Sequence, residues 1–272
     1  MLIPLKDTNP LKRIRFQYVT VALIAACAGV FLWQVSLGTE GGQRAIYQFG
    51  TIPATILGDK CLNPDIAVIA PELTLISSMF LHGDWMHIIG NMLFLWVFGD
   101  NVEDSMGHAK FLFFYLLCGV AAALAHVFTN AESAIPTIGA SGAVSGVLGA
   151  YLVLHPKAQV LTLLLRIIVT LPAVVVLGLW IGLQFFNAWM TAGDATGGGV
   201  AWWAHIGGFV VGAVLIVPFR HKSVPLLDGL VSSGGGPGGG KSGGPSGGTP
   251  KPRSKVTGRS RIPPSGRRGD GD

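Results

Sequence analysis

The sequence predicts an all-α membrane protein whose six transmembrane helices form one bundle, and two observations support this fold class. Half of the 272 residues are hydrophobic and only 12% are charged, which is too apolar for an ordinary soluble domain. The charges are also unevenly placed, so that uncharged runs approach the length of about 20 residues that a membrane-spanning helix needs. No segment alternates over about ten residues as a membrane β-barrel strand would.

Six apolar segments without Asp, Glu, Lys or Arg are the candidate spans. They are residues 17–37, 85–98, 111–127, 141–154, 171–189 and 201–219. The fourth ends before Pro156, because the residue preceding a proline disfavours helix.

The connecting segments differ in character. Residues 38–82 are too long for a turn and too apolar for a free linker, so we expect a partly membrane-embedded first loop with short helices. Residues 100–110 read as a charged loop, residues 160–170 as an interfacial stretch, and residues 192–199 as a Gly-rich turn.

The spans lie between two polar ends. Residues 1–16 form a basic head, residues 17–220 the membrane domain, and residues 221–272 a basic tail rich in Gly, Pro and Ser, which predicts disorder. The tail has the charge to lie on anionic lipid, although a solvated tail without a specific partner is the simpler interpretation.

Lysine and arginine predict the orientation, because they favour the cytoplasmic side. With a cytoplasmic head, the loops on that side hold Lys110, Lys157, Arg166, Arg220 and Lys222. The opposite side keeps Arg44 and Lys60 among acidic residues. Both termini are therefore expected in the cytoplasm. The absence of an organelle transit signal favours a bacterial inner membrane, and nothing in the sequence indicates a nucleic-acid partner.

Four polar residues reach a similar depth when this topology is applied. Ser141 begins the fourth span, His205 lies one turn into the sixth, and His87 and Asn91 lie one to two turns into the second. All three spans enter from the side opposite the termini. Ionisable groups inside a membrane are costly, so their coincidence is a functional hypothesis.

Small residues lie on the faces that carry Ser141 and His205. Gly208 and Gly212 follow His205 at three and seven residues, and Gly142 and Gly146 form a GxxxG beside Ser141. Two helices with such faces can approach closely, as a serine–histidine hydrogen bond requires.

The chemistry assigns a role to each group. Ser141 is the candidate nucleophile and His205 the candidate general base. The Asn91 amide, the His87 ring N–H and the Ser141 backbone N–H are candidate oxyanion donors, aided by the positive end of the helix. No Asp or Glu lies at this depth in any span, which predicts a dyad.

Each residue alone has a plainer explanation. A lone serine usually caps or packs a helix, a GxxxG usually means helix association, and an intramembrane Asn often joins helices. These explanations do not predict the coincidence of all four groups. His82, His126 and His155 lack such support, and the three cysteines show no metal spacing.

At these residues the sequence resembles the rhomboid family of intramembrane serine proteases. Gly139–Gly142 matches the family's GxSG, Ala204–Gly212 its AHxxGxxxG, and His87–Asn91 its HxxxN, in the family's order along the chain. The resemblance covers about residues 15–220. It implies a serine endopeptidase that cuts transmembrane helices of other membrane proteins near the outer face of the bilayer, without a metal or other cofactor.

The resemblance also implies that residues 38–82 form the family's membrane-embedded loop and that the fifth span is a mobile substrate gate. Two features depart from some members. No tryptophan lies between Trp33 and Trp85, so the loop lacks a Trp-Arg pair. Ser145 stands where an aromatic residue stacks on the catalytic histidine, so another group must hold His205.

Three alternatives remain open. A catalytically silent relative that binds membrane proteins in quality control predicts a missing nucleophile or base, whereas both are present. A transporter or channel predicts polar residues across the whole membrane depth. A metalloenzyme or haem protein would use His82, His87 and His205, but no HExxH is present. The natural substrate and the oligomeric state are not predicted.

Overall fold

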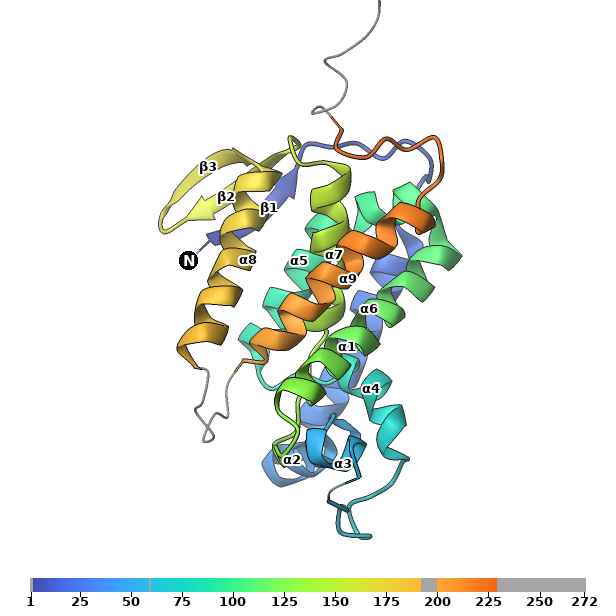
Figure 1. The fold of residues 1–272 in the computed structure, drawn as a ribbon, viewed down its shortest axis with the longest axis vertical. Coiled ribbons are helices and arrows are strands. Elements are labelled where there is room, and N and C mark those ends of the chain that lie inside the picture. The colour runs from blue at the N-terminus through green and yellow to red at the C-terminus, as the bar shows by residue number, and fades with distance from the viewer. Residues whose placement is uncertain (1, 59, 192–199, 229–272) are drawn as a thin grey trace, which may run out of the picture. The chain divides into compact units, whose positions relative to one another are not determined.

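The computed structural model describes residues 2–58, 60–191 and 200–228, and this part of the chain is mostly helical (Figure 1). The long helices are α1 (Tyr18–Ser36), α5 (Trp85–Met106), α6 (His108–Thr129), α7 (Ser141–Leu154), α8 (Ala173–Met190) and α9 (Trp202–Phe219). The predicted turn 192–199 and residues 229–272 of the predicted disordered tail lie outside the described residues.

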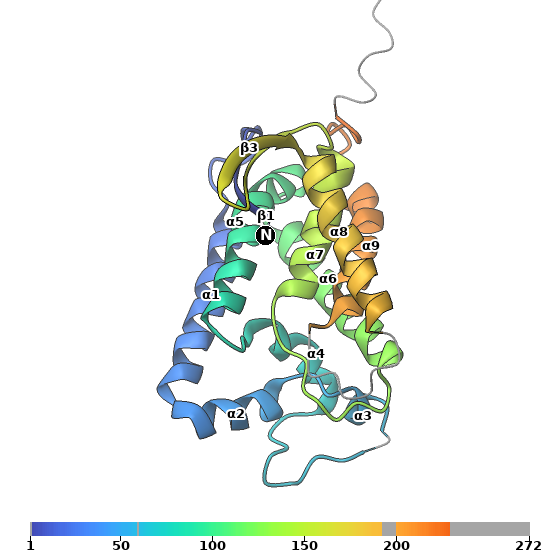
Figure 2. The same ribbon diagram turned by 90° about the vertical axis from the view of Figure 1, so that its left-hand side faces the viewer.

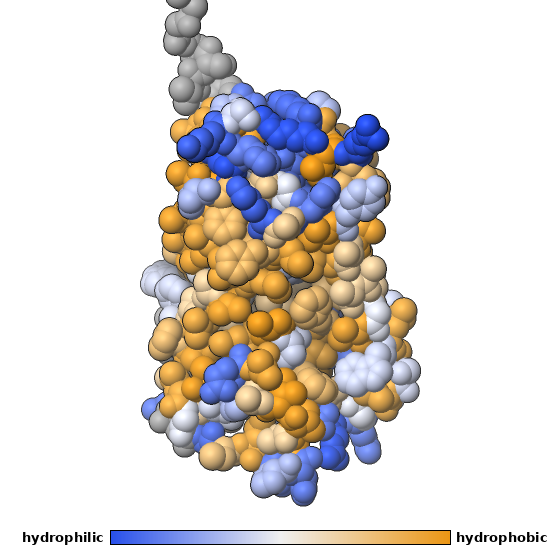
Figure 3. Space-filling view, turned by 90° about the vertical axis from the view of Figure 1, so that its right-hand side faces the viewer, coloured by the Kyte–Doolittle hydropathy of each residue, from blue (hydrophilic) through white to orange (hydrophobic). Residues whose placement is uncertain are grey.

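Four of these helices, α1, α6, α8 and α9, are long and apolar enough to cross a membrane. α7 is apolar but shorter. A broad hydrophobic surface separates a hydrophilic end of the molecule from a mixed one in Figure 3. The chain is therefore a multi-pass integral membrane protein.

α7 lies at the centre of the bundle and is buried along most of its length. It packs against α9, α6 and α5 (Figure 1). Its first residue is Ser141, as predicted, and it ends at Leu154, just before His155 and Pro156. The central helix thus carries the candidate nucleophile at one end.

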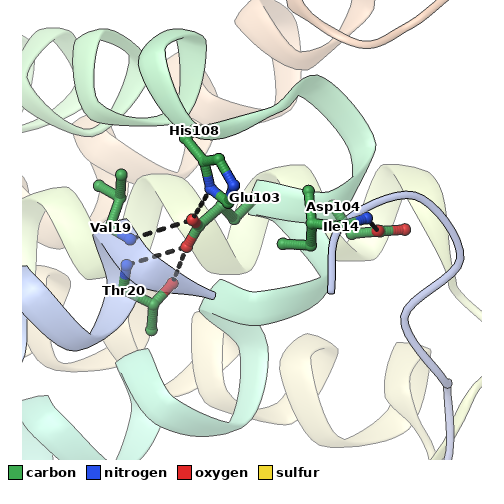
Figure 4. Close-up of polar contacts among 6 residues, drawn as sticks. All are labelled: Ile14, Val19, Thr20, Glu103, Asp104 and His108. Carbon is green, nitrogen blue, oxygen red and sulfur yellow. Dashed lines mark hydrogen bonds and ion pairs between the residues drawn. The ribbon is translucent and has the colours of Figure 1, made fainter. Parts of the chain in front are cut away.

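The predicted charged loop at residues 100–110 is wrong for most of its length. α5 continues to Met106 and α6 begins at His108, with only Gly107 between them. Glu103 is fully buried and accepts hydrogen bonds from the backbone N–H groups of Val19 and Thr20, at 3.0 and 2.9 Å (Figure 4). α1 has no side-chain cap of its own. The carboxylate therefore satisfies the exposed N–H groups at the start of α1.

Asp104 holds the segment before α1 in a similar way. Its carboxylate accepts hydrogen bonds from the backbone N–H groups of Lys12, Arg13 and Ile14, at 3.1, 2.6 and 2.7 Å. The carboxylates of Glu103 and Asp104 thus bind backbone N–H groups and do not face water. The sequence pattern alone does not distinguish a carboxylate that binds backbone from one in a solvated loop.

The all-α prediction is wrong for two segments, which form a three-stranded antiparallel sheet. The strands are β1 (Leu2–Asp7), β2 (Gln159–Leu164) and β3 (Ile167–Pro172), in the order β1-β2-β3. Part of the head and the expected interfacial stretch therefore pair with each other. Leu165, with φ +57°, and Arg166 make the turn between β2 and β3. The sheet lies at the end of the bundle opposite α2 and α3 (Figure 2).

The segment between α1 and α5 contains short helices, as expected. They are α2 (Gly38–Phe49), α3 (Pro53–Ile56), a 3₁₀ turn at Pro71–Leu73, α4 (Thr74–Ser77) and a second 3₁₀ turn at Ser78–Phe80. Thr51 and Thr137 exchange two backbone hydrogen bonds, at 3.0 and 2.7 Å. This contact fixes the segment that leads into α7.

Residues 221–228, which were expected to belong to the disordered tail, pack against the bundle. The His221 N–H donates to the carbonyl of Ser105 at 2.8 Å, and the Leu227 N–H donates to that of Val153 at 2.8 Å. Val224 is buried. A hydrophobic anchor and backbone hydrogen bonds thus order the first residues after α9.

Candidate active site

The chain enters α7 through Gly139, whose φ of +119° lies in the region that glycine tolerates. The Gly139 N–H donates to the carbonyl of Ser78 at 2.9 Å, which ties this turn to the loop segment. A Cβ at position 139 would lie 2.7 Å from Nε2 of His87. Only glycine therefore allows the histidine ring to approach the backbone just before Ser141, which itself is half-buried.

His87 and Asn91 converge on this turn from α5. Asp84 caps α5 by accepting from the His87 N–H at 2.8 Å, and the Gly83 N–H donates to Nδ1 of the His87 ring at 3.3 Å. Since Nδ1 accepts, a neutral ring carries its proton on Nε2, the atom that faces Gly139.

The Asn91 amide is the second donor in this turn. Its Nδ2 would lie 3.7 Å from a Cβ at Gly139. This nitrogen is buried and has no hydrogen-bond partner among the described residues. Buried amide donors are usually paired, so this unpaired nitrogen, at the turn just before Ser141, can donate to an acceptor bound there.

α7 and α9 are in backbone contact through the four glycines singled out in the sequence. A Cβ at Gly208 would collide with the carbonyl of Gly142, and one at Gly212 with the carbonyl of Gly146. Such packing requires small residues. It brings the first turns of the two helices, which carry Ser141 and His205, into contact.

Within the described residues, no hydrogen bond joins the Ser141 hydroxyl to His205. Ser141 and Ala204, the neighbour of His205, line one small cavity of about 30 Å³, enough for roughly one water molecule. Ser145 donates its hydroxyl to the Ser141 carbonyl at 2.6 Å. Apo hydrogen bonds between catalytic groups are often loose and tighten on substrate binding.

His205 is held by residues that the sequence analysis did not identify. Its Nδ1 lies 2.8 Å from Oε1 of Gln184, and its ring centroid lies 5.8 Å from that of Trp180 and 6.2 Å from that of Trp202. Gln184 and Trp180 belong to α8. The only sequence signal was a glutamine within an apolar span, four residues after a tryptophan.

The other histidines have separate surroundings. The backbone N–H and C=O of His82 bind the Gln34 side chain, at 3.0 and 3.3 Å, and the His82 ring centroid lies 5.2 Å from that of His87. His126, near the end of α6, contacts Asn130, the residue that follows this helix, and His155 follows α7. The described chain contains no group of three or more His, Cys, Asp or Glu residues that could hold a metal.

A family model decides the classification. The model of the Rhomboid domain matches residues 72–222, more than half of the chain, and this range includes all four candidate site residues. The chain belongs to the rhomboid family. α1 and most of the loop segment lie before the matched rhomboid region.

Individual rhomboid relatives match different lengths of this chain. Rhomboid protein 1, mitochondrial, of Saccharomyces cerevisiae is 32% identical over 151 residues, which cover 54% of this chain and 41% of the yeast protein. Presenilin-associated rhomboid-like protein A, mitochondrial, of Danio rerio is 29% identical over 61% of this chain and 46% of its own length. Rhomboid protease GluP of Bacillus subtilis is 40% identical over 29% of this chain and 15% of its own. The chain spans less than half the length of each of these relatives.

Proposed function

We propose that this rhomboid is an intramembrane serine endopeptidase that cleaves transmembrane helices of other membrane proteins. The observation that carries the proposal is the unpartnered Asn91 amide, which converges with Nε2 of His87 on the turn just before Ser141. A helix-packing serine would need neither donor. A nucleophile that generates an oxyanion would need both.

The proposed reaction begins when the Ser141 hydroxyl proton passes to Nε2 of His205 and Oγ bonds to the carbonyl carbon of the scissile peptide. The carbonyl oxygen becomes an oxyanion, which the Asn91 amide, the His87 Nε2–H and the Ser141 backbone N–H stabilise. His205 then gives its proton to the leaving amine, and the C–N bond breaks. Water, deprotonated by His205, attacks the acyl carbon; the ester bond then breaks, and His205 returns the proton to the serine oxygen.

The proposed topology has six membrane helices, α1 and α5 to α9, with both termini in the cytoplasm. The lysine and arginine distribution supports this orientation, and the apolar face of residues 85–98 supports a span in the first part of α5. Residues 38–82 would then lie against the outer leaflet, beside Ser141. α8 would move away from α5 to admit a substrate helix.

Two findings bear on the membrane that contains the protein. The match to GluP of Bacillus subtilis shows that a bacterial protein is among the relatives, which favours the bacterial membrane expected from the sequence. The mitochondrial names of the yeast and zebrafish relatives weigh against that assignment. The proposal therefore concerns the reaction and is independent of the compartment.

The deciding experiment is cleavage of a single-span substrate by the purified full-length protein in lipid. We expect the wild type to cleave, in the presence of EDTA as well, and Ser141→Ala and His205→Ala to lose cleavage. Reaction of Ser141 with a fluorophosphonate probe, lost in His205→Ala, tests the dyad without a substrate. Cleavage that survives Ser141→Ala contradicts the mechanism. Neither cleavage nor labelling of the wild type would favour a catalytically silent binding factor.

A further inference from the structure

Gln184 is a buried polar side chain on α8, a helix that is otherwise almost entirely apolar. Its Oε1 lies 2.8 Å from Nδ1 of His205, which is also buried. A polar group buried within a membrane helix is costly unless it is paired. The pair with His205 therefore accounts for the presence of a glutamine at this position.

The orientation of the Gln184 amide is set by its second hydrogen bond. Nε2 of Gln184 donates to the backbone carbonyl of Trp180 at 3.1 Å. The opposite orientation would place two acceptor oxygens against each other. Oε1 therefore faces His205, and because an amide oxygen only accepts, the proton between the two side chains belongs to Nδ1 of the imidazole. A neutral His205 then has its lone pair on Nε2.

Trp180 restricts the same imidazole ring from a second side. The two ring centroids lie 5.8 Å apart with the planes inclined by 35°, and the Trp180 ring also stacks on Phe209 of α9 at 6.3 Å. Trp180 and Gln184 are four residues apart and thus share one face of α8. A single helix face supplies both the hydrogen-bond acceptor and the aromatic contact for His205.

We propose that Gln184 is the positioning residue of the dyad, and that it holds His205 in the Nδ1–H tautomer only while α8 packs on α9. This inference rests on the proposed function of His205 as the general base. A neutral amide selects the tautomer as a carboxylate would, without a second buried charge. Since α8 is the proposed gate, outward movement of α8 would release the base, and its return would restore it.

The first test measures the tautomer directly and needs no proteolysis. The full-length protein, labelled with ¹⁵N at its histidine imidazoles, is examined in lipid by NMR, and the His205 signals are assigned by their loss in His205→Ala. We expect protonated Nδ1 and unprotonated Nε2 in the wild type, and a mixture of tautomers in Gln184→Leu. A wild-type His205 protonated at Nε2, or unchanged populations in Gln184→Leu, would overturn the proposal even if the protein is a protease.

The second test separates positioning from folding. We expect Gln184→Leu and Gln184→Met to lower kcat by about tenfold or more, with KM little changed, since the loss of one hydrogen bond in the transition state corresponds to roughly that factor. Gln184→Glu keeps an acceptor oxygen, so His205 should remain in the Nδ1–H tautomer in this variant. Leu183→Ala, at an exposed neighbouring position, is the matched control.

The Gln184 variants distinguish positioning of His205 from packing of α8. If Gln184→Leu is too unstable to purify, Gln184→Met preserves the side-chain length and gives the same readouts. A kcat that stays within twofold of the wild type in both variants contradicts the positioning role. A fall in Tm without any change of tautomer shows that Gln184 only packs α8 against α9, and this also overturns the proposal.

Discussion

Asn91 shows the clearest sign of an absent partner among the described residues of the site. Its amide nitrogen is buried without an acceptor, although nearly all buried polar groups in proteins are paired. By contrast, His87 is oriented by Gly83 and Asp84, and its Nε2 faces the same turn. The His87 ring is thus oriented by a hydrogen bond, whereas the Asn91 amide nitrogen has a free donor.

Asn91→Ala tests whether this free donor serves the transition state. We expect kcat to fall by roughly 10²–10³ with KM little changed, because an oxyanion donor acts on charge that exists only in the transition state. The free energy of unfolding should change little, since the removed nitrogen has no partner in the described fold. Steady-state cleavage and thermal unfolding measure the two effects, with Met92→Leu as the control. A twofold change in kcat, or a large loss of stability, would assign Asn91 to packing.

α5 carries candidate site residues at one end and structural carboxylates at the other. His87 and Asn91 lie near its start, and Glu103 and Asp104 lie near its end, where they bind the backbone at and before the start of α1. A carboxylate at a helix N-terminus satisfies N–H groups and favours the helix dipole. The polar end of α5 therefore fixes α1, which packs along α5 in the bundle.

Glu103→Ala tests this fixing of α1. The substitution leaves the N–H groups of Val19 and Thr20 and the Thr20 hydroxyl without their acceptor, and we expect the free energy of unfolding to fall by about 3 kcal/mol. Glu103→Gln keeps an acceptor oxygen and should cost less. Thermal unfolding in lipid nanodiscs gives the comparison. Equal Tm values for wild type and Glu103→Ala would mean that packing alone holds α1.

Across the whole molecule, the sequence predicted those elements whose signal is local. α7 begins at Ser141 and ends at Leu154, where predicted, because a small-residue turn precedes it and His155-Pro156 follows it. α1 and α9 lie within the expected spans because uncharged runs have clear ends. The same pattern could not reveal β1, since Leu2 pairs with Leu164, a residue far along the chain.

Buried polar residues limited the prediction of the fold and of the site in the same way. Glu103 was expected in a surface loop, because a charged residue predicts solvent exposure. Its hydrogen-bond partners at the start of α1 lie far away along the chain. Gln184 was missed because its partner, His205, lies on another helix. Spacing within one helix grouped His87 with Asn91 and His205 with the glycines. Contacts that single residues make between helices, such as that of Gln184 with His205, could be identified only from the structure.

The sheet connects the ends of several helices, and Asp7 of β1 makes this connection sensitive to pH. The Asp7 carboxylate accepts from the Tyr151 hydroxyl of α7 at 2.6 Å and from the Asn101 amide of α5 at 3.0 Å. Burial raises the pKa of Asp7 above its ordinary value, and the hydrogen bond from Tyr151 offsets only part of this rise. The folded protein therefore retains a proton that the unfolded chain releases at lower pH.

The sign of the effect follows from this difference in bound protons. As the pH rises above about 4, the unfolded chain loses the Asp7 proton first, so the free energy of unfolding falls until the folded carboxyl has also ionised. Asp7→Asn keeps an oxygen for Tyr151 but cannot ionise. We expect the Tm of the wild type to fall relative to that of Asp7→Asn as the pH rises above about 4, until the folded carboxyl has ionised. Asp65→Asn, at an exposed carboxyl, serves as the control. Parallel curves for wild type and Asp7→Asn would show that Asp7 stays ionised in the folded protein, and that β1 joins α5 and α7 through a charged contact instead of a protonated one.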